Sequence, residues 1–405
     1  MNEKLIIVLS EIKVRKYDIL RFDLEKYESI SGHKVEIHEL IEYIHPGFSS
    51  MFSQTYEDAR IKFFFNFDEW EKRISHLKKK YGDNILILNF ISVITFKSLK
   101  INYFIKKNNF KTLNYTLGNF PIEYYHLSQP RKNIKNIFLL LKIIFLYPKK
   151  LKVLIEKEVC KFIAQKLKLF SYYLLVVGKK DALNFKENNY TKIIYGHSFD
   201  YNMYLKYKNV QYLRKDNYGL FLEAPSPVHN LGDNYISGMK VFRGTRDKWL
   251  KSLNNFFDFI EKELNIKILI APHPKIKHLE KFSKWYNGRE VLEDGLYQTA
   301  KNAKIIISRD SVGFSYAAIY KIPAIFFFTD ELIKEDIFLE QQNNFASTLG
   351  LTPINIDTNI SKDKLESILK FQKTKYEDYV SQYLTSRNDN KKNFEIINES
   401  LNQDT

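Results

Sequence analysis

Short apolar runs alternate with helix-length stretches along the whole chain, and this alternation restricts the fold more than any other feature of the sequence. Residues 5–9 form an apolar run, residues 17–27 carry apolar side chains at helical spacing, and residues 34–38 alternate like a strand. The order strand, helix, strand predicts a mostly parallel sheet with helices on both faces. Further strands of the first half are expected at residues 84–89, 111–116, 174–177 and 192–195.

The second half repeats this pattern after a polar break at residues 214–217. Its expected strands are Tyr218–Leu222, 266–271, 304–308 and Ala324–Phe328, and its expected helices are 247–264, 296–302, 312–320 and 362–371. We therefore predict an α/β protein with two doubly wound, Rossmann-like domains, residues 1–214 and 215–375, facing each other across a cleft. Residues 376–405 are expected to form a C-terminal helix and tail, with the polar end from residue 386 frayed.

The composition of the chain indicates which partners it binds and in which cellular compartment it works. A length of 405 residues suits two domains, and a net charge of +16 predicts an anionic partner: nucleic acid, a phospholipid surface or a phosphorylated small molecule. The single cysteine, Cys160, excludes an internal disulfide framework, and its amphipathic surroundings predict a buried structural thiol. The N-terminal apolar run is too short for a signal peptide, so we expect a cytoplasmic protein.

A histidine between two prolines follows one strand of the second half. In Ile268-Leu-Ile-Ala-Pro-His-Pro-Lys275, His273 comes directly after the apolar run. Ligands of open α/β sheets bind beyond the carboxyl ends of the strands, and prolines stiffen the loop there. The imidazole of His273 could therefore donate to a phosphate oxygen, with Lys275 adding positive charge. The alternative is a loop histidine that only caps a carbonyl group.

A serine-rich turn follows the next strand and opens a helix. Its residues of interest are Ser308, Ser311, Gly313 and Ser315. Free N–H groups at the start of the helix, together with the serine hydroxyls, predict an anion site, and the glycine would let the helix approach closely. Asp310 disfavours a phosphate at this turn unless it caps the helix or pairs with Arg309, so an ordinary capped helix is the alternative.

Taken in order, these two segments resemble the donor-binding half of GT-B glycosyltransferases. The His-Pro motif and the serine-containing turn are similar to those with which bacterial sialyltransferases and 3-deoxy-octulosonate transferases hold a cytidine monophosphate leaving group. The turn also resembles that of the cytidine-diphosphate-glycerol glycerophosphotransferases of teichoic acid synthesis. The resemblance covers about residues 218–328.

The resemblance implies roles for these residues. His273 would stabilise the leaving phosphate, and the three serines would lie along the phosphate or ribose of the nucleotide. Glu293 and the backbone near Gly295 would flank the base. The sequence departs from the sialyltransferase pattern because its only Glu-Asp-Gly, residues 293–295, lies in the second domain rather than the first.

Two carboxylates are candidates for the catalytic base. Asp200 and His197 follow a strand of the first domain and are expected to face the cleft, whereas Glu223 follows the first strand of the second domain. A carboxylate at a strand end can take a proton from an acceptor hydroxyl while the phosphate departs on the opposite face. The stiff, proline-rich loop after Glu223 favours that residue. The alternatives are structural, with Asp200 capping a helix and Glu223 pairing with a lysine.

Patterns for metals and other cofactors are missing from the sequence. It contains no Asp-x-Asp, no His-x-x-x-His, no GxGxxG and no P-loop. We therefore expect no metal ion and no other cofactor, so that positive side chains and helix N–H groups stabilise the leaving group.

A basic and apolar segment, residues 131–152, has the most unusual composition of the chain. Its apolar part is too short to span a bilayer, but lysines at both ends suit a helix that lies on an anionic membrane. The alternative is a core helix of the first domain. No basic and aromatic motif of a nucleic-acid-binding module is visible.

These observations together predict an inverting, metal-independent glycosyltransferase at the inner face of the cytoplasmic membrane. It would move a sugar, expected to be a CMP-activated acidic sugar, from a nucleotide donor to a glycan or lipid-linked glycan of a bacterial capsule or lipopolysaccharide. Transfer of glycerol phosphate from CDP-glycerol is one alternative, and a non-catalytic nucleotide- or membrane-binding subunit is another. Nucleic acid is not an expected partner.

Overall fold

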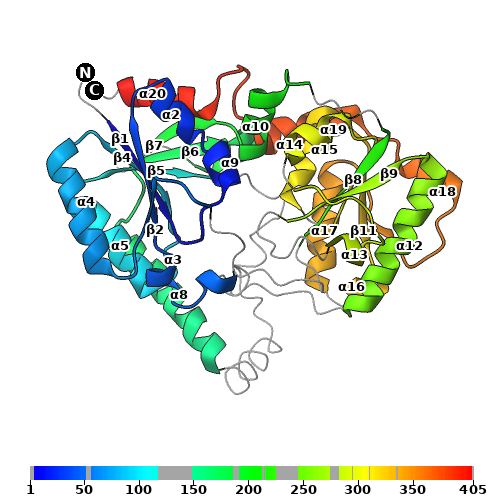
Figure 1. Cartoon of the computed structure of the whole chain (residues 1–405), viewed down its shortest axis with the longest axis horizontal. Helices are drawn as coiled ribbons and strands as arrows, with labels where there is room; N and C mark the ends of the chain where they lie inside the picture. Colours follow the sequence, from blue (N-terminus) through cyan, green and yellow to red (C-terminus); the bar gives the residue numbers. More distant parts are fainter. Residues whose placement is uncertain are drawn as a thin grey trace.

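The chain folds into two parallel β-sheets, each with helices packed against it (Figure 1). The structure is a computed structural model that describes residues 4–51, 56–116, 148–185, 191–211, 214, 216–224, 245–273, 282–293, 295–309, 311–333 and 336–403. The first sheet uses strands from the first half of the chain and the second sheet uses strands from the second half. The prediction of two doubly wound units is confirmed, while the exact domain bounds remain a prediction.

The first sheet has seven strands in the order β3-β2-β1-β4-β5-β6-β7, with every neighbouring pair parallel. Its strands are β1 (Leu5–Ser10), β2 (Lys34–Glu39), β3 (Ile61–Phe63), β4 (Ile85–Phe90), β5 (Lys111–Tyr115), β6 (Tyr173–Val177) and β7 (Lys192–Gly196). The connecting helices include α1 (Lys16–Arg21), α2 (Leu24–Ser29), α3 (Ile41–Ile44), α4 (Phe67–Tyr81), α5 (Phe96–Lys107), α8 (Pro148–Lys166), α9 (Gly178–Asn184) and α10 (Phe199–Tyr207).

Helix α4 illustrates how the sequence specifies these elements. The side chain of Asn66 accepts a hydrogen bond from the Glu69 N–H at the start of the helix, and three lysines in the last turn complement the helix dipole. One face carries Phe67, Trp70, Ile74, Leu77 and Tyr81, all buried. This apolar stripe at helical spacing packs on the sheet.

The second sheet has five parallel strands in the order β12-β11-β10-β8-β9. Its strands are β8 (Tyr218–Leu222), β9 (Lys267–Ala271), β10 (Ile306–Ser308), β11 (Ala324–Phe328) and β12 (Ile354–Asn355). Its helices include α12 (Arg246–Leu264), α13 (Phe282–Trp285), α14 (Leu296–Thr299), α15 (Ser315–Tyr320), α16 (Asp330–Ile333), α17 (Asp336–Thr348), α18 (Lys362–Ile368) and α19 (Lys373–Tyr379). Two apolar clusters, one containing Phe314 and Phe326 and the other Phe257 and Phe327, form its core.

The expected helix 312–320 is divided in the structure. Residues Val312–Phe314 form a 3-10 turn, and the α-helix α15 begins only at Ser315. It ends at Lys321, which adopts the left-handed conformation with φ of 56°.

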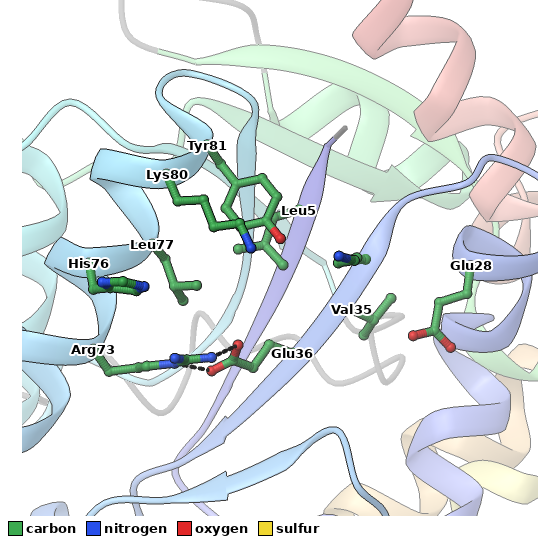
Figure 2. Close-up of a pocket in the computed structure, with 10 residues that line it drawn as sticks. Leu5, Glu28, Val35, Glu36, Arg73, His76, Leu77, Lys80 and Tyr81 are labelled. Atoms are coloured by element: carbon green, nitrogen blue, oxygen red, sulfur yellow. Dashed lines mark hydrogen bonds and ion pairs between the residues drawn. The ribbon is translucent and has the colours of Figure 1, made fainter. Parts of the chain in front are cut away.

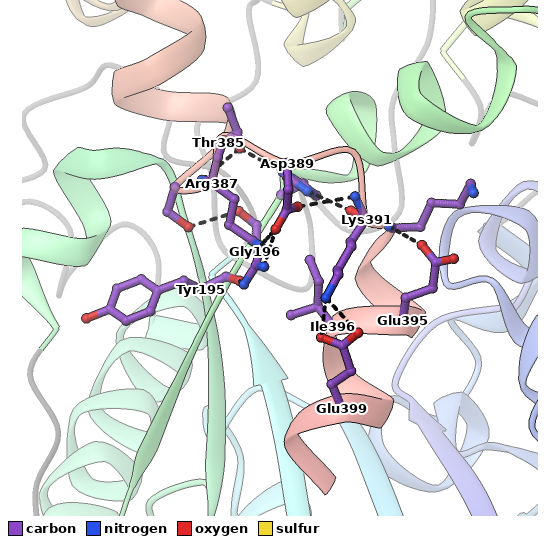
Figure 3. Close-up of polar contacts among 12 residues, drawn as sticks. Tyr195, Gly196, Thr385, Arg387, Asp389, Lys391, Glu395, Ile396 and Glu399 are labelled. Carbon is purple, nitrogen blue, oxygen red and sulfur yellow. Dashed lines mark hydrogen bonds and ion pairs between the residues drawn. The ribbon is translucent and has the colours of Figure 1, made fainter. Parts of the chain in front are cut away.

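The end of the chain returns to the first domain, and the expectation of a frayed tail from residue 386 is wrong. After the π-helical turn η5 (Val380–Leu384), helix α20 (Asn393–Gln403) packs against β7 (Figure 1). Its residues Phe394, Ile396, Ile397 and Leu401 are buried in the apolar cluster of the first sheet, and burial of this area outweighs the polarity of the other face. Figure 3 shows the polar contacts between the two segments, in which Thr385 to Lys391 lie against Tyr195 and Gly196.

Candidate functional site

The carboxyl ends of three adjacent strands bring together three of the predicted site residues. In the strand order β10-β8-β9, Ser308 ends β10, Glu223 directly follows β8, and His273 follows β9 after one proline. The register aligns Leu222 with both Ser308 and Ala271. Because neighbouring strands lie about 4.8 Å apart, the β9 and β10 ends are separated by roughly 10 Å, with Glu223 between them.

The same edge contains the point at which the strand order of the second sheet reverses. From β8 the chain passes to β9 on one side and then to β10 on the other. Open α/β sheets bind ligands in the crevice at such a point, because the loops there leave in opposite directions. The predicted serine turn after β10 and Glu223 after β8 flank this position.

Glu223 is almost fully buried, with 2% of its surface exposed. The hydroxyl of Tyr286 donates a 2.7 Å hydrogen bond to its Oε1. Burial raises the pKa of Glu223 to about 8, against the opposing effects of the Tyr286 hydrogen bond and the charge of Arg309. The carboxyl group is therefore mostly protonated at neutral pH, and a tyrosine hydroxyl is one of its partners.

Arg309 is a residue that the sequence interpretation did not assign to the site. It follows Ser308 directly, is 3% exposed, and its guanidinium lies 5.9 Å from the centre of the Trp249 ring. Its charge acts on Glu223 and lowers the pKa of that carboxyl. An arginine directly after a buried strand was the signal available in the sequence.

The serine turn is built largely from its own hydrogen bonds. The Ser311 N–H donates to the Ser308 hydroxyl oxygen over 3.2 Å, and Ser308 is fully buried. A Cβ atom on Gly313 would lie 2.9 Å from Cδ2 of Leu296, so a larger side chain at this position would press on that leucine. Asp310 lies outside the described residues.

Asp200 and Ser315, predicted for different domains, are in direct contact. The Ser315 hydroxyl donates a 2.6 Å hydrogen bond to Oδ2 of Asp200. Asp200 lies in the first turn of α10, which Ser198 caps by accepting from the Tyr201 N–H. Asp200 is therefore not the cap residue, and its side chain is directed to the second domain.

The surroundings of Asp200 come from both halves of the chain. Burial raises its pKa to about 6, while the hydrogen bond from Ser315 and the charge of Arg21 lower it. Burial raises the pKa of Tyr17 and Tyr316, and repulsion between their phenolates and this carboxylate raises it further. At neutral pH this carboxyl group is mostly ionised.

His197 does not lie with Asp200, although the sequence predicted that both face a cleft. It is fully buried, its Nδ1 lies 2.7 Å from the Thr385 hydroxyl, and its Nε2 lies 2.9 Å from the carbonyl oxygen of Lys391. Burial lowers its pKa to about 4. The imidazole is therefore neutral and holds the returning C-terminal segment.

The remaining predicted donor residues are less closely gathered. Gly295 starts α14 in the left-handed conformation with φ of 85°, and Glu293 before it is exposed. His273 is partly exposed. Lys275 lies outside the described residues.

The first sheet has its own reversal point, between β1 and β4, and polar groups that the sequence interpretation missed gather there. The Ser92 hydroxyl donates a 2.8 Å hydrogen bond to Glu11, which follows β1. Nε2 of His45 lies 3.9 Å from the other oxygen of Glu11, and His45 is 8% exposed. Polar residues directly after β1 and β4 were the sequence signal.

A cavity of about 420 Å³ lies at the opposite, amino-terminal edge of the first sheet (Figure 2). It is lined by the starts of β1 and β2 and by α4, with Arg73 donating two hydrogen bonds to Glu36. Of the predicted site residues that the structure describes, none lines this cavity.

Among the described residues there is no group of three or more His, Cys, Asp or Glu side chains that could hold a metal ion. No helix in the described part of the chain is long and apolar enough to cross a bilayer. Residues 131–147 of the basic segment lie outside the described residues. Cys160 is buried, as predicted.

Comparisons with known proteins identify the architecture. No protein-family model matches the sequence, and no curated protein matches it. Among solved structures, the wall teichoic acid polymerase TagF is similar with a TM-score of 0.54 and 12% identity, over 100% of this chain and 89% of that chain. A second TagF structure, soaked with CDPG, gives a TM-score of 0.52 at 11% identity over the same shares. A UDP-N-acetylglucosamine 2-epimerase from Listeria monocytogenes gives 0.50 at 11% identity, over 99% of this chain and 95% of that chain. These likenesses show the fold: the chain has the GT-B architecture of two Rossmann-like domains.

Proposed function

We propose that the protein is an inverting, metal-independent glycosyltransferase that takes a sugar from a cytidine-activated donor. The donor would be a CMP-activated acidic sugar, and the acceptor a glycan or lipid-linked glycan of a bacterial capsule or lipopolysaccharide, at the inner face of the cytoplasmic membrane. The observation that carries the proposal is the grouping of Glu223, His273 and the serine turn at the reversal point of the second sheet. The domains proposed for acceptor and donor are residues 1–214 and 215–375, with 376–405 closing onto the first.

The leaving phosphate would be held by groups at this edge. His273 would supply a donor from the loop after β9, and Lys275 would add positive charge. Ser311 and Ser315 lie at the opening of the helix after β10, beside Gly313. Arg309 adds a buried positive charge under the turn. Preorganised donors of this kind stabilise the negative charge that develops as the phosphate departs.

Asp200 is a better base than Glu223 at neutral pH. A general base must be ionised, and the pKa of Asp200, about 6, meets that condition, whereas the pKa of Glu223, about 8, does not. The carboxylate of Asp200 would take the proton of the acceptor hydroxyl as the new glycosidic bond forms and the bond to the phosphate breaks. Glu223, protonated, would fix Tyr286 and the β8 edge.

Transfer of glycerol phosphate is the second candidate. Its support is the likeness to TagF, which extends over all of this chain, and the resemblance of the serine turn to the CDP-glycerol enzymes. The same residues would then bind cytidine diphosphate-glycerol. The donors of both candidate reactions contain cytidine, so the first experiment tests whether the protein recognises this base.

A thermal-shift screen of cytidine, uridine, guanosine and adenosine mono- and diphosphates tests the donor class. A ligand at 100 times its dissociation constant stabilises the folded protein by about 2.7 kcal/mol, enough for a clear shift in Tm. We expect CMP or CDP to stabilise and the other nucleotides to have little effect. A response to uridine nucleotides alone would contradict a cytidine donor.

Transfer itself is tested with radiolabelled donor and total glycolipid as acceptor. His273→Ala should reduce transfer at least 100-fold if the imidazole stabilises the leaving phosphate, by analogy with loss of one oxyanion donor. His76→Ala, which removes an exposed histidine of the first domain, is the matched control. Equal activity of both variants and the wild type would exclude this role, and nucleotide binding without transfer would favour a non-catalytic subunit.

A further inference from the structure

Two neighbouring helices of the first domain expose apolar side chains among lysines. On α5, Phe96 and Tyr103 are 54% and 46% exposed. On α8, Ile155, Val159 and Phe162 are 54%, 38% and 60% exposed. We call these five residues the α5–α8 face.

The two helices that carry the face lie side by side. The Phe96 N–H donates to Glu156 of α8 over 2.9 Å, and ten residues later the Lys106 ammonium donates to the Leu167 carbonyl just after α8, also over 2.9 Å. Contacts at both ends make the helices parallel neighbours, on the same side of the first sheet (Figure 1). The spacing of residues 155, 159 and 162 places them on one stripe of α8, and residues 96 and 103 share the outer stripe of α5.

The two helices that carry the face are strongly basic in sequence. Helix α5 contains four lysines and no acidic residue, and α8 contains six lysines and two glutamates. Each helix thus has a net charge of +4, and the pair provides half of the +16 of the chain. Exposed apolar side chains of this size mark contact surfaces, and lysines beside them suit an anionic partner.

We propose that the α5–α8 face docks the protein on an anionic phospholipid surface, with Ile155 and Phe162 inserted among the acyl chains and the lysines at the headgroups. A second copy of the chain fits less well, because two such faces would oppose like charges. A nucleic acid would leave the aliphatic Ile155 and Val159 against phosphates. The proposal specifies the surface for the membrane partner of the proposed function, and it does not depend on the chemistry of transfer.

Sedimentation of the full-length protein with phosphatidylcholine vesicles, with and without phosphatidylglycerol, tests the proposal. We expect binding only to the anionic vesicles, weakened by salt. The double variant Ile155→Gln and Phe162→Gln should bind at least tenfold more weakly, because two apolar insertions are lost. Ile30→Gln, which changes an isoleucine of comparable exposure (64%) on another surface, is the matched control and should bind like the wild type.

Three results would overturn the proposal: equal binding to neutral vesicles, wild-type binding by the double variant, or a dimer in light scattering that the double variant dissociates. A different outcome is that duplex DNA, added at the same total charge as the lipid, displaces the wild type from vesicles and fails to bind the double variant. That pair of results would assign the face to nucleic acid. The double variant should keep the nucleotide-induced thermal shift of the wild type. Loss of vesicle binding with that shift retained separates this proposal from the failure of the donor assignment.

Discussion

The Ser315 hydroxyl donates a 2.6 Å hydrogen bond to the Asp200 carboxylate, and the two residues come from helices that follow strands of different sheets. The bond lies near the buried residues Tyr17, Tyr316 and Tyr379, whose pKa values are raised by burial and, to a smaller extent, by the charge of this carboxylate. A charge-assisted hydrogen bond in such a place is stronger than one in water. It therefore connects the proposed donor helix to the proposed base.

Ser315→Ala should shift the pH dependence of transfer. The hydrogen bond from Ser315 lowers the pKa of Asp200, so its removal raises that pKa above about 6. If ionised Asp200 is the base, the ascending limb of kcat/KM against pH moves to higher pH, and Asp200→Asn abolishes most of the activity. Ser347→Ala, an exposed serine, should leave the profile in place. An unchanged limb in Ser315→Ala would remove Asp200 as the base and turn attention to Glu11 and His45.

Glu223→Gln should make stability less dependent on pH. The folded-state pKa of Glu223, about 8, lies above its ordinary value of 4.5, so the folded protein binds the proton more tightly. The contribution of Glu223 to the free energy of unfolding is complete below pH 4.5 and is lost as the pH rises toward 8. Each unit of pKa difference between the folded and unfolded states corresponds to about 1.4 kcal/mol. Glutamine resembles the protonated acid and keeps the acceptor for Tyr286.

We therefore expect Glu223→Gln to match the wild type in urea unfolding at pH 5 and to exceed it at pH 8.5. The exposed Glu366→Gln is the control and should differ from the wild type at neither pH. A variant that is less stable than the wild type at pH 8.5 would show that Glu223 is needed in its charged form.

Gly178→Ala should prevent the normal packing of the C-terminal segment. Gly178 begins α9 with φ of 73°, and a Cβ atom there would lie 2.3 Å from the Gln382 carbonyl oxygen. Gly82 has a similar φ of 59° but no atom within 4 Å of its Cβ position. Both alanine variants carry the strain of positive φ, about 1 kcal/mol, and only Gly178→Ala adds the clash with backbone.

Chemical denaturation measures the difference between these two variants. We expect the free energy of unfolding to fall by at least about 2 kcal/mol more in Gly178→Ala than in Gly82→Ala. A loss of this size is within the range for overpacked protein cores. Equal losses would mean that η5 moves away from α9 at little cost.

Asn393→Ala should destabilise the first domain. The Asn393 side chain accepts from the His197 N–H over 2.9 Å and donates to the His197 carbonyl over 2.8 Å, all buried. Its removal leaves two buried backbone groups without these partners, at a cost of about 2–3 kcal/mol. Asn402→Ala near the exposed end of α20 is the control. Thermal unfolding with equal Tm for the two variants would contradict the structural role of this residue.

The positions of the strands could be foreseen from the sequence where the strands are long and buried on both faces. Residues 5–9, 84–89 and 324–328 are examples, because continuous apolar runs leave few other structures possible. The two strands β3 and β12 escaped prediction since they have three and two residues and lie at sheet edges. Strands of two or three residues are too short to show a periodic pattern of apolar side chains.

The site was foreseen only in outline. The positions of His273, Glu223 and Ser308 at or just after the ends of their strands follow from the parallel pattern, since all carboxyl ends meet at one edge of the sheet. The partners of these groups do not follow from it. Asp200 and Ser315 are 115 residues apart, and Tyr286 reaches Glu223 from 63 residues away. Such contacts depend on tertiary packing, which cannot be predicted from the local periodicity of the sequence.

The return of α20 to the first sheet determines when that domain can be completed. During synthesis the seven strands of the first sheet leave the ribosome long before residues 393–403, which bury Phe394 and Ile397 against it. Until residues 393–403 have been synthesised, that part of the apolar surface is uncovered and the His197 backbone lacks its hydrogen bonds with Asn393. The first domain is therefore incomplete during the whole synthesis of the second domain. In this period it exposes apolar surface to which chaperones can bind.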